Sequence, residues 1–227
     1  MRETIPIFER KESVLPKPQA IFFDLDGTLV LAPQFYTDVY TGTLVNLVKE
    51  MRGDKGLEML WARESLDGKG ELTLMAMGIP YRAWAQKLID APLDLVIPQP
   101  ETVSCIRALK AKKIIFTGSP VQMAYRLLDR LGFNPRFDFD LIIGWKEPEA
   151  YPLKWNNSSY IFETVCALMD ADPKEVWSVG DNWEADLEPA KRVGITTIQI
   201  RKETGVPDFR FPDIESLVTA FQNGSYV

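Results

Sequence analysis

Residues 20–28 read AIFFDLDGT, a run of apolar and aromatic residues followed at once by two acids and a turn. A continuous apolar run without polar alternation is typical of a strand buried on both faces of a parallel sheet. Asp24 and Asp26 follow that strand one residue apart, so their side chains point the same way. We therefore expect a buried strand that ends in a pair of carboxylates.

This pair of acids needs an explanation, because like charges about 4 Å apart repel by a few kcal/mol at an effective dielectric near 20. A bound cation, or a proton held by one of the acids, would offset the repulsion. An ordinary turn is the alternative, since Asp and Gly are common turn residues. A calcium-binding EF-hand loop fails, because its glycine and glutamate positions hold Leu29 and Phe35.

Further apolar runs predict more strands of the same sheet, at residues 113–117, 176–180 and 195–200, with a weaker candidate at 141–143. Apolar residues at helical spacing lie between these runs. Ser119 and Pro120 are suitable as the N-cap and first-turn residues of one helix, and Gly132 would close it. Strands that alternate with helices predict the α/β class with a doubly wound parallel sheet.

Residues 33–97 break this alternation, because they are rich in helix formers and contain no convincing strand. We predict an N-terminal extension at residues 1–18, an α/β core domain formed by residues 19–32 and 98–227, and a small α-helical cap domain at residues 33–97. A helical insertion at this point would lie over the carboxyl ends of the strands. Ligands bind at those ends in open α/β sheets.

The composition bounds the class of protein. With 227 residues, 46% hydrophobic and 26% charged, the chain is an ordinary globular protein and not a fibrous or disordered one. Its net charge of −6 argues against a nucleic acid polymer or an anionic membrane as partner. No apolar run is long enough for a transmembrane helix, and the charged N-terminus is unlike a signal peptide. Cys105 and Cys166 are expected to be free thiols, so we expect a cytoplasmic protein.

The chain contains no histidine. This excludes a Ser-His-Asp triad, a Cys-His pair, a histidine nucleophile and any His-ligated metal site. Acid–base chemistry must therefore come from Asp, Glu, Lys, Tyr or Cys.

A second group of acids lies in residues 180–186, which read GDNWEAD. Asp181 falls at the end of a predicted strand, and Asp186 about one turn into the next helix; helix capping is the simpler alternative for both. Thr117 also falls at a strand end. Because these ends share one edge of a parallel sheet, the acids together predict a hard-oxygen site suited to Mg²⁺.

From about residue 19 to residue 200, the sequence resembles the haloacid dehalogenase (HAD) superfamily, in its phosphatase type with a helical cap inserted after the first motif. Four motifs occur in the family's order. They are DLDGT at residues 24–28, the strand ending in Thr117-Gly118-Ser119, Lys154 before a helix, and Gly180-Asp181 followed by Asp186. The family's lysine is usually followed by proline, but Trp155 stands here, and Lys146 is the alternative lysine.

The resemblance implies a role for each acid. Asp24 would attack phosphorus and form an aspartyl-phosphate, while Asp26 would act as general acid and then general base. Mg²⁺ would be held by Asp24, the main-chain carbonyl of Asp26 and Asp181, with Asp186 ordering the surrounding ligands.

The resemblance also implies a phosphate-binding set. Lys154 would add a second positive charge, and Thr117 with the amides of Gly118 and Ser119 would bind phosphoryl oxygens. Both Thr117 and Lys154 count among the residues implied to be catalytic.

The implied activity is Mg²⁺-dependent hydrolysis of small-molecule phosphate monoesters. Asp26 favours a phosphatase, because ion-pumping ATPases of the superfamily carry threonine at this place and dehalogenases generally lack aspartate there. A phosphomutase or phosphotransferase, and a non-catalytic binding protein of the same fold, are the alternatives. The cap would choose the substrate, which is a nucleotide, a sugar phosphate or a phosphoglycolate-like metabolite. Candidate cap residues for contacting it are Arg63, Lys69, Tyr81, Arg82 and Trp84.

Overall fold

The computed structural model describes residues 15–67, 73–74, 76–145, 154 and 159–224. The side chains of residues 63–67 and 145 also lie outside the description. Of the predicted positions, residues 1–14 of the extension, Lys69 and Lys146 therefore fall outside the described residues, as does the side chain of Arg63.

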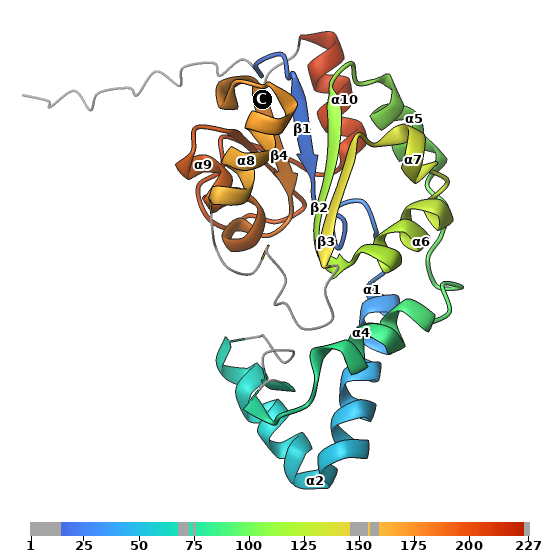
Figure 1. The fold of residues 1–227 in the computed structure, drawn as a ribbon. Coiled ribbons are helices and arrows are strands. Elements are labelled where there is room, and N and C mark those ends of the chain that lie inside the picture. The colour runs from blue at the N-terminus through green and yellow to red at the C-terminus, as the bar shows by residue number, and fades with distance from the viewer. Residues whose placement is uncertain (1–14, 68–72, 75, 146–153, 155–158, 225–227) are drawn as a thin grey trace, which may run out of the picture.

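A six-stranded parallel sheet forms the centre of the molecule, in the order β3-β2-β1-β4-β5-β6. This confirms the predicted doubly wound α/β class. β1 lies between β2 and β4, and all three run toward the same edge (Figure 1). The strands are β1 Ala20–Phe23, β2 Lys112–Pro120, β3 Leu141–Trp145, β4 Val176–Gly180, β5 Thr196–Ile200 and β6 Phe209–Phe211.

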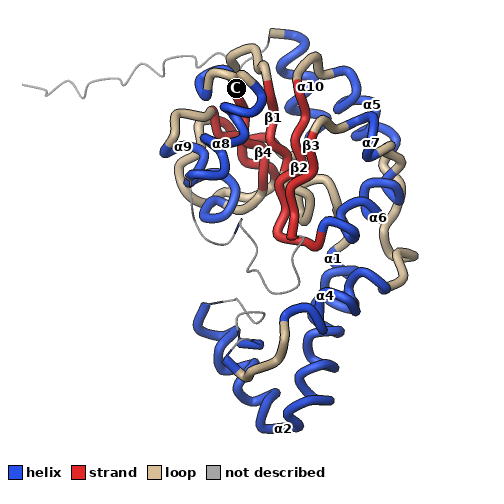
Figure 2. Tube along the Cα trace, in the orientation of Figure 1, coloured by secondary structure: helices blue, strands red, loops and turns tan. Residues whose placement is uncertain are grey.

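Helices cover both faces of this sheet (Figure 2). On one face, α8 and α9 pack against a cluster that includes Ala20 and Phe22. On the other face, α5, α6 and α10 pack against a cluster that includes Ile21 and Phe23. Alternate residues of β1 thus enter opposite cores, which is why its sequence is apolar throughout. The core helices are α5 Pro100–Ala108, α6 Val121–Leu131, α7 Pro135–Asp138, α8 Tyr160–Met169, η3 Pro173–Glu175, η4 Trp183–Leu187, α9 Glu188–Arg192 and α10 Ile214–Asn223.

Between residues 33 and 97, the described part of the chain consists of helices joined by turns and irregular segments, with no strand among the described residues. Figure 1 shows α2 and α4 as a layer beyond the ends of the strands. Gly53, with φ +64°, breaks the regular geometry of α2. The helices are α1 Pro33–Phe35, η1 Tyr36–Thr41, α2 Gly42–Asp67 and α4 Tyr81–Asp90. The division into an extension, a core and a cap domain stays a prediction.

The structure corrects one local prediction. Ser119 is not an N-cap, because β2 continues through Pro120 and α6 begins only at Val121. Pro120 takes the capping position without a side-chain hydrogen bond. Gly132 closes the helix as expected, in the left-handed conformation with φ +104°.

Cys105 and Cys166 are free thiols. The described part of the chain contains no helix that is both long and apolar enough to cross a membrane. The end of the predicted N-terminal extension contacts the core, because the Trp177 indole donates a hydrogen bond to the Pro16 carbonyl at 3.0 Å.

Candidate active site

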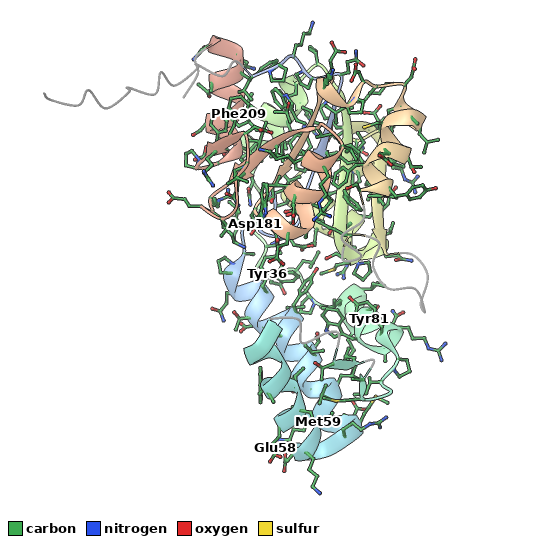
Figure 3. The ribbon with its side chains drawn as sticks, turned by 90° about the vertical axis from the view of Figure 1, so that its left-hand side faces the viewer. Tyr36, Glu58, Met59, Tyr81, Asp181 and Phe209 are labelled. Carbon is green, nitrogen blue, oxygen red and sulfur yellow. The ribbon has the colours of Figure 1, made fainter. Side chains whose placement is uncertain are left out.

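Three strands that are far apart in sequence bring the predicted residues to one edge of the sheet. In the paired register, Phe23 of β1 lies beside Ile115 of β2 and Val179 of β4. The residues that follow these three positions, including Asp24, Thr117 and Asp181, therefore lie at the same edge of the sheet. Figure 3 shows Asp181 at the boundary between the sheet and the inserted helices, with Tyr36 close by.

Asp24 is buried, with 6% of its surface exposed. Its backbone N–H donates to the Val179 carbonyl at 2.9 Å, which ties it to the neighbouring strand. The Thr28 hydroxyl donates to Asp24 Oδ2 at 2.7 Å, and the Lys154 ammonium donates to Oδ1. Both carboxylate oxygens are thus held in fixed directions.

Lys154 is also buried, and it joins three parts of the site. Its Nζ pairs with Asp24, donates to the Phe116 carbonyl at 3.0 Å and lies 2.7 Å from Asp186 Oδ1. Burial alone would lower the pKa of Lys154, but the charges of Asp186 and Asp24 raise it above its ordinary value. The lysine therefore stays charged beside Asp24 and Asp186.

Asp24, Asp181 and Asp186 form a carboxylate cluster in which one oxygen from each lies within 4.8 Å of the others. Burial, and then the charge of Asp24, raises the pKa of both Asp181 and Asp186. Lys202 partly offsets this shift at Asp181, where its Nζ lies 2.7 Å from Oδ2. The cluster therefore concentrates more negative charge than its surroundings neutralise.

The two oxygens of Asp186 have different partners. Asp186 Oδ1 is buried and pairs with the Lys154 ammonium at 2.7 Å. Asp186 Oδ2 accepts a hydrogen bond from the Asn182 backbone N–H at 2.9 Å. Hard carboxylate oxygens from three side chains that lie within 4.8 Å of one another fit a divalent cation such as Mg²⁺. These residues therefore suit the metal that the sequence predicts.

Two glycines make room for the carboxylates. A Cβ atom on Gly27, whose φ is +89°, would lie 2.8 Å from Asp181 Oδ2. A Cβ atom on Gly180 would lie 2.3 Å from Asp186 Oδ2. Any larger residue at either position would push a carboxylate out of place.

The Asp26 side chain lies apart from the carboxylate cluster and receives four hydroxyl groups. Thr117 and Ser119 donate to Oδ2 at 2.9 and 2.7 Å, while Tyr36 and Tyr40 donate to Oδ1 at 3.0 and 3.3 Å. Burial, and then the charge of Asp24, raises the pKa of Asp26, whereas several of these hydrogen bonds act in the opposite direction. The side chain therefore occupies a separate position suited to proton transfer.

A local hydrogen bond also stabilises the conformation of residues 117–119, because the Ser119 amide donates to Thr117 Oγ1 at 3.0 Å. That amide is therefore engaged inside the protein, in contrast to its implied role of binding phosphoryl oxygens. Gly118 and Ser119 nevertheless face the cavity.

A cavity of about 340 Å³ separates the sheet edge from the inserted helices. Its core side carries the carboxylates and its cap side carries aromatic rings. The residues that line it are Asp24, Asp26, Tyr36, Tyr40, Thr41, Leu44, Tyr81, Trp84, Gly118, Ser119, Lys154, Asp181, Asn182, Ala185, Asp186 and Lys202.

The predicted cap residues are only partly brought to this cavity. Tyr81 and Trp84 line it, whereas Arg82 is not among the lining residues. Lys69 and the side chain of Arg63 lie outside the described residues.

Sequence reasoning missed several lining residues, among them Tyr36, Tyr40 and Lys202. Two signals could have found them. Tyr36 and Tyr40 are four residues apart just after the first motif, and Lys202 follows the strand predicted at residues 195–200.

Sheet, helical insertion and carboxylate-lined cavity together define an enzyme of the doubly wound α/β class. The chain belongs to the haloacid dehalogenase-like hydrolases, because residues 18–194 match the model of that family. This confirms the resemblance noted from the sequence and establishes the protein as a hydrolase. Hydrolases of this family act on small molecules. No curated protein sequence matches the chain.

Solved structures of the family share the fold. A HAD phosphatase from Thermococcus onnurineus is 20% identical, with a TM-score of 0.60 over 92% of this chain and 100% of that one. L-2-haloacid dehalogenase from Xanthobacter autotrophicus is 16% identical, with a TM-score of 0.54 over 91% of this chain and 99% of that one. A Bacillus subtilis protein titled as a HAD-hydrolase with bound magnesium is 16% identical, with a TM-score of 0.60 over 90% of this chain and 99% of that one.

Proposed function

We propose that the protein is a Mg²⁺-dependent phosphatase that hydrolyses small-molecule phosphate monoesters. The observation that carries the proposal is the arrangement of Asp24 and Asp26. The first joins a carboxylate cluster suited to a divalent cation, and the second is held apart by hydroxyl groups at the same cavity. This separation supplies a nucleophile and a proton donor as two distinct groups.

The dehalogenase among the structural neighbours represents the rival chemistry. A halide leaves as a stable anion and needs no proton, whereas the leaving oxygen of a phosphate ester does. A carboxyl group held beside the nucleophile, as Asp26 is, therefore favours the phosphate ester.

The proposed reaction has two steps. In the first, a carboxylate oxygen of Asp24 forms a bond to phosphorus, the ester P–O bond breaks, and the leaving oxygen takes the proton of Asp26. In the second, Asp26 takes a proton from water as the water oxygen attacks phosphorus and the bond between phosphorus and the Asp24 oxygen breaks, which releases inorganic phosphate and regenerates the Asp24 carboxylate. The first step leaves Asp26 ionised, so that it can accept a proton in the second step. The second step returns Asp26 to its protonated form and Asp24 to its ionised form, ready for the next substrate.

The surroundings of Asp24 would assist both steps. Asp24, Asp181 and Asp186 would hold the cation, which when bound would offset the repulsion between an anionic nucleophile and an anionic phosphoryl group. Lys154 holds one oxygen of Asp24 and keeps its positive charge in a buried site. Most of the catalysis would then come from positioning and charge stabilisation.

The cap side of the cavity favours one class of leaving group. Four of its lining residues are aromatic: Tyr36, Tyr40, Tyr81 and Trp84. Both lysines that line the described cavity are paired with carboxylates, Lys154 with Asp24 and Asp186 and Lys202 with Asp181. An uncharged leaving group with a flat ring, such as a nucleoside, fits this wall better than the carboxylate of phosphoglycolate.

The test is release of phosphate from p-nitrophenyl phosphate in the presence of Mg²⁺. We expect turnover by the wild type, its loss with EDTA, and a loss of at least about 10³-fold in Asp24→Asn. Asp170→Asn is the matched control, because Asp170 lies at the end of α8 in a left-handed conformation that Asn also adopts.

Two results would contradict the proposal. One is undiminished phosphate release by Asp24→Asn or in EDTA. The other is release of halide from a 2-haloalkanoate by a wild type that hydrolyses no phosphate ester. Turnover only with a phosphorylated activator would instead identify a phosphomutase.

A further inference from the structure

The two oxygens of the Asp26 carboxylate face different parts of the molecule. Oδ2 accepts hydrogen bonds from Thr117 and Ser119, which belong to β2. Oδ1 accepts from Tyr36 and Tyr40, which belong to η1 at the start of the helical insertion. Asp26 therefore lies between the sheet and the segment that leads away from it.

Tyr36 and Tyr40 reach the same oxygen because they are four residues apart on one helical turn and share a face. Their rings meet edge to face with centroids 5.2 Å apart. The fully buried ring of Phe35 packs against both, at 5.6 and 5.7 Å. The two rings therefore have little freedom to turn their hydroxyl groups away from Asp26.

Tyr40 is also fixed from α4. The buried indole of Trp84 donates to the Tyr40 carbonyl at 3.3 Å and to the Thr43 hydroxyl at 3.0 Å. The Tyr40 and Trp84 rings lie 6.1 Å apart, edge to face. The Tyr40 hydroxyl touches the Ser119 hydroxyl as well, so this ring joins α4, β2 and Asp26.

We propose that Tyr36 and Tyr40 are positioning residues for Asp26, which aim its carboxyl group at the leaving-group oxygen. The inference rests on the proposed function, since it assumes that Asp26 transfers a proton. The tyrosine hydroxyls hold Oδ1 from the side of the insertion, while Thr117 and Ser119 hold Oδ2 from β2, so the plane of the carboxyl group is fixed from both sides. These hydroxyl groups can still admit the proton of the carboxylic acid, because a hydroxyl group both donates and accepts.

The proposal assigns the positioning of Asp26 to the tyrosine hydroxyl groups and not to the tyrosine rings. The rings line the cavity and would contact substrate whether or not the hydroxyls are present. Replacement of tyrosine by phenylalanine keeps the ring and removes only the hydroxyl group, with its hydrogen bond to Asp26 and its contact with the Val30 carbonyl (Tyr36) or the Ser119 hydroxyl (Tyr40). An effect on proton transfer alone then distinguishes positioning from cavity shape.

The experiment compares two esters of the same shape, phenyl phosphate and p-nitrophenyl phosphate, with Mg²⁺ present. Phenolate is the poorer leaving group and depends more on a proton donor. In the Tyr36→Phe/Tyr40→Phe double variant we expect kcat to fall about 10-fold more for phenyl phosphate than for p-nitrophenyl phosphate, with KM changed less than about twofold. Each single variant should show part of this difference.

Two controls keep the result specific. Tyr125→Phe makes the same chemical change on α6, away from the cavity, and should alter neither ester. In an Asp26→Asn background, removing the tyrosine hydroxyls should have no further effect on kcat, because the residues act through Asp26.

An equal fall for both esters, a rise confined to KM, or an additional loss in the Asp26→Asn background would overturn the positioning role while leaving the phosphatase proposal intact. A wild type that hydrolyses neither ester would overturn both. If the double variant fails to fold, as judged by circular dichroism, the same comparison is decided with Tyr36→Phe alone.

Discussion

Gly27 shows how a single residue can set the geometry of the site. Its φ of +89° lies in the left-handed region, and the missing side chain leaves Asp181 Oδ2 only 2.8 Å from where a Cβ atom would be. Gly194 has nearly the same backbone conformation, φ +85°, but nothing lies within 4 Å of its Cβ position. A comparison of substitutions at the two glycines therefore distinguishes the cost of the left-handed backbone conformation from the cost of steric contact with Asp181.

We expect Gly27→Ala and Gly194→Ala each to lose about 1–2 kcal/mol of unfolding free energy, because both place an L-residue in the left-handed region. Only Gly27→Ala should also weaken metal binding, since it displaces Asp181. Urea denaturation and calorimetric titration with Mg²⁺ would measure the two effects. Equal Mg²⁺ affinity in both variants would show that Asp181 does not need this close approach.

The sequence predicted individual site residues unevenly. The acids were identifiable because they directly follow apolar strands, and strand ends share an edge in a parallel sheet. The spacing of Tyr36 and Tyr40 could have placed them on one helical face, but their contact with Asp26 depends on how η1 is oriented, which no local pattern reports. Lys154 needed the family resemblance, since one lysine in a loop has no distinguishing context of its own.

At the scale of secondary-structure elements, one ion pair connects α5 to α7. The guanidinium of Arg107 donates to both oxygens of Asp138, through Nε at 2.8 Å and Nη2 at 2.7 Å. The hydrogen bonds from Arg107 hold the pKa of Asp138 below its ordinary value, and the Asn134 backbone N–H contributes in the same direction. The charged form of Asp138 is thus favoured in the folded protein.

A lowered folded-state pKa stabilises the protein above the unfolded-state pKa, and the contribution is lost as the pH falls through the folded-state value. Asp138→Asn should therefore lower the unfolding free energy by about 1 kcal/mol at neutral pH, a modest figure because Arg107 is about half exposed. The deficit should shrink toward zero below about pH 4.

Urea denaturation as a function of pH would test this. Glu188→Gln is the comparison, because Glu188 pairs with Arg192 within a single helix at an exposed site. Its loss should stay below about 0.5 kcal/mol. A deficit in Asp138→Asn that is independent of pH would contradict the assignment.

Elements with strong apolar patterns were predictable from sequence, and those fixed by tertiary contacts were not. β1, β2, β4 and β5 lie within a few residues of their predicted positions. β6 was missed because it has three residues, FRF, and pairs only at the edge of the sheet. Ser119 was misassigned as an N-cap because its hydroxyl serves Asp26 instead of a helix terminus.

At the scale of the whole molecule, we expect metal binding by the carboxylate cluster to raise the stability of the folded protein. Asp24 and Asp181 follow two central strands and Asp186 lies in η4, so an ion that binds all three stabilises only the folded arrangement. Mg²⁺ in about 100-fold excess over its dissociation constant should raise Tm by roughly 5–10 °C.

Asp186→Asn should largely abolish this rise, whereas Asp170→Asn should retain it, because Asp170 is the C-cap residue of α8 and is not a member of the carboxylate cluster. Scanning calorimetry with Mg²⁺ and with K⁺ at matched ionic strength would measure the difference. An equal shift in Asp186→Asn and wild type would place the stabilising ion elsewhere on the protein.

The sheet order also has a consequence for the nascent chain on the ribosome. β1 lies between β2 and β4, so it is synthesised before either neighbour, and β2 begins only at Lys112. At about 5–20 residues per second, the most apolar strand waits roughly 5–20 s for its first partner. During that interval its backbone edges are open to other chains, which makes this strand the segment that a chaperone would shield during translation.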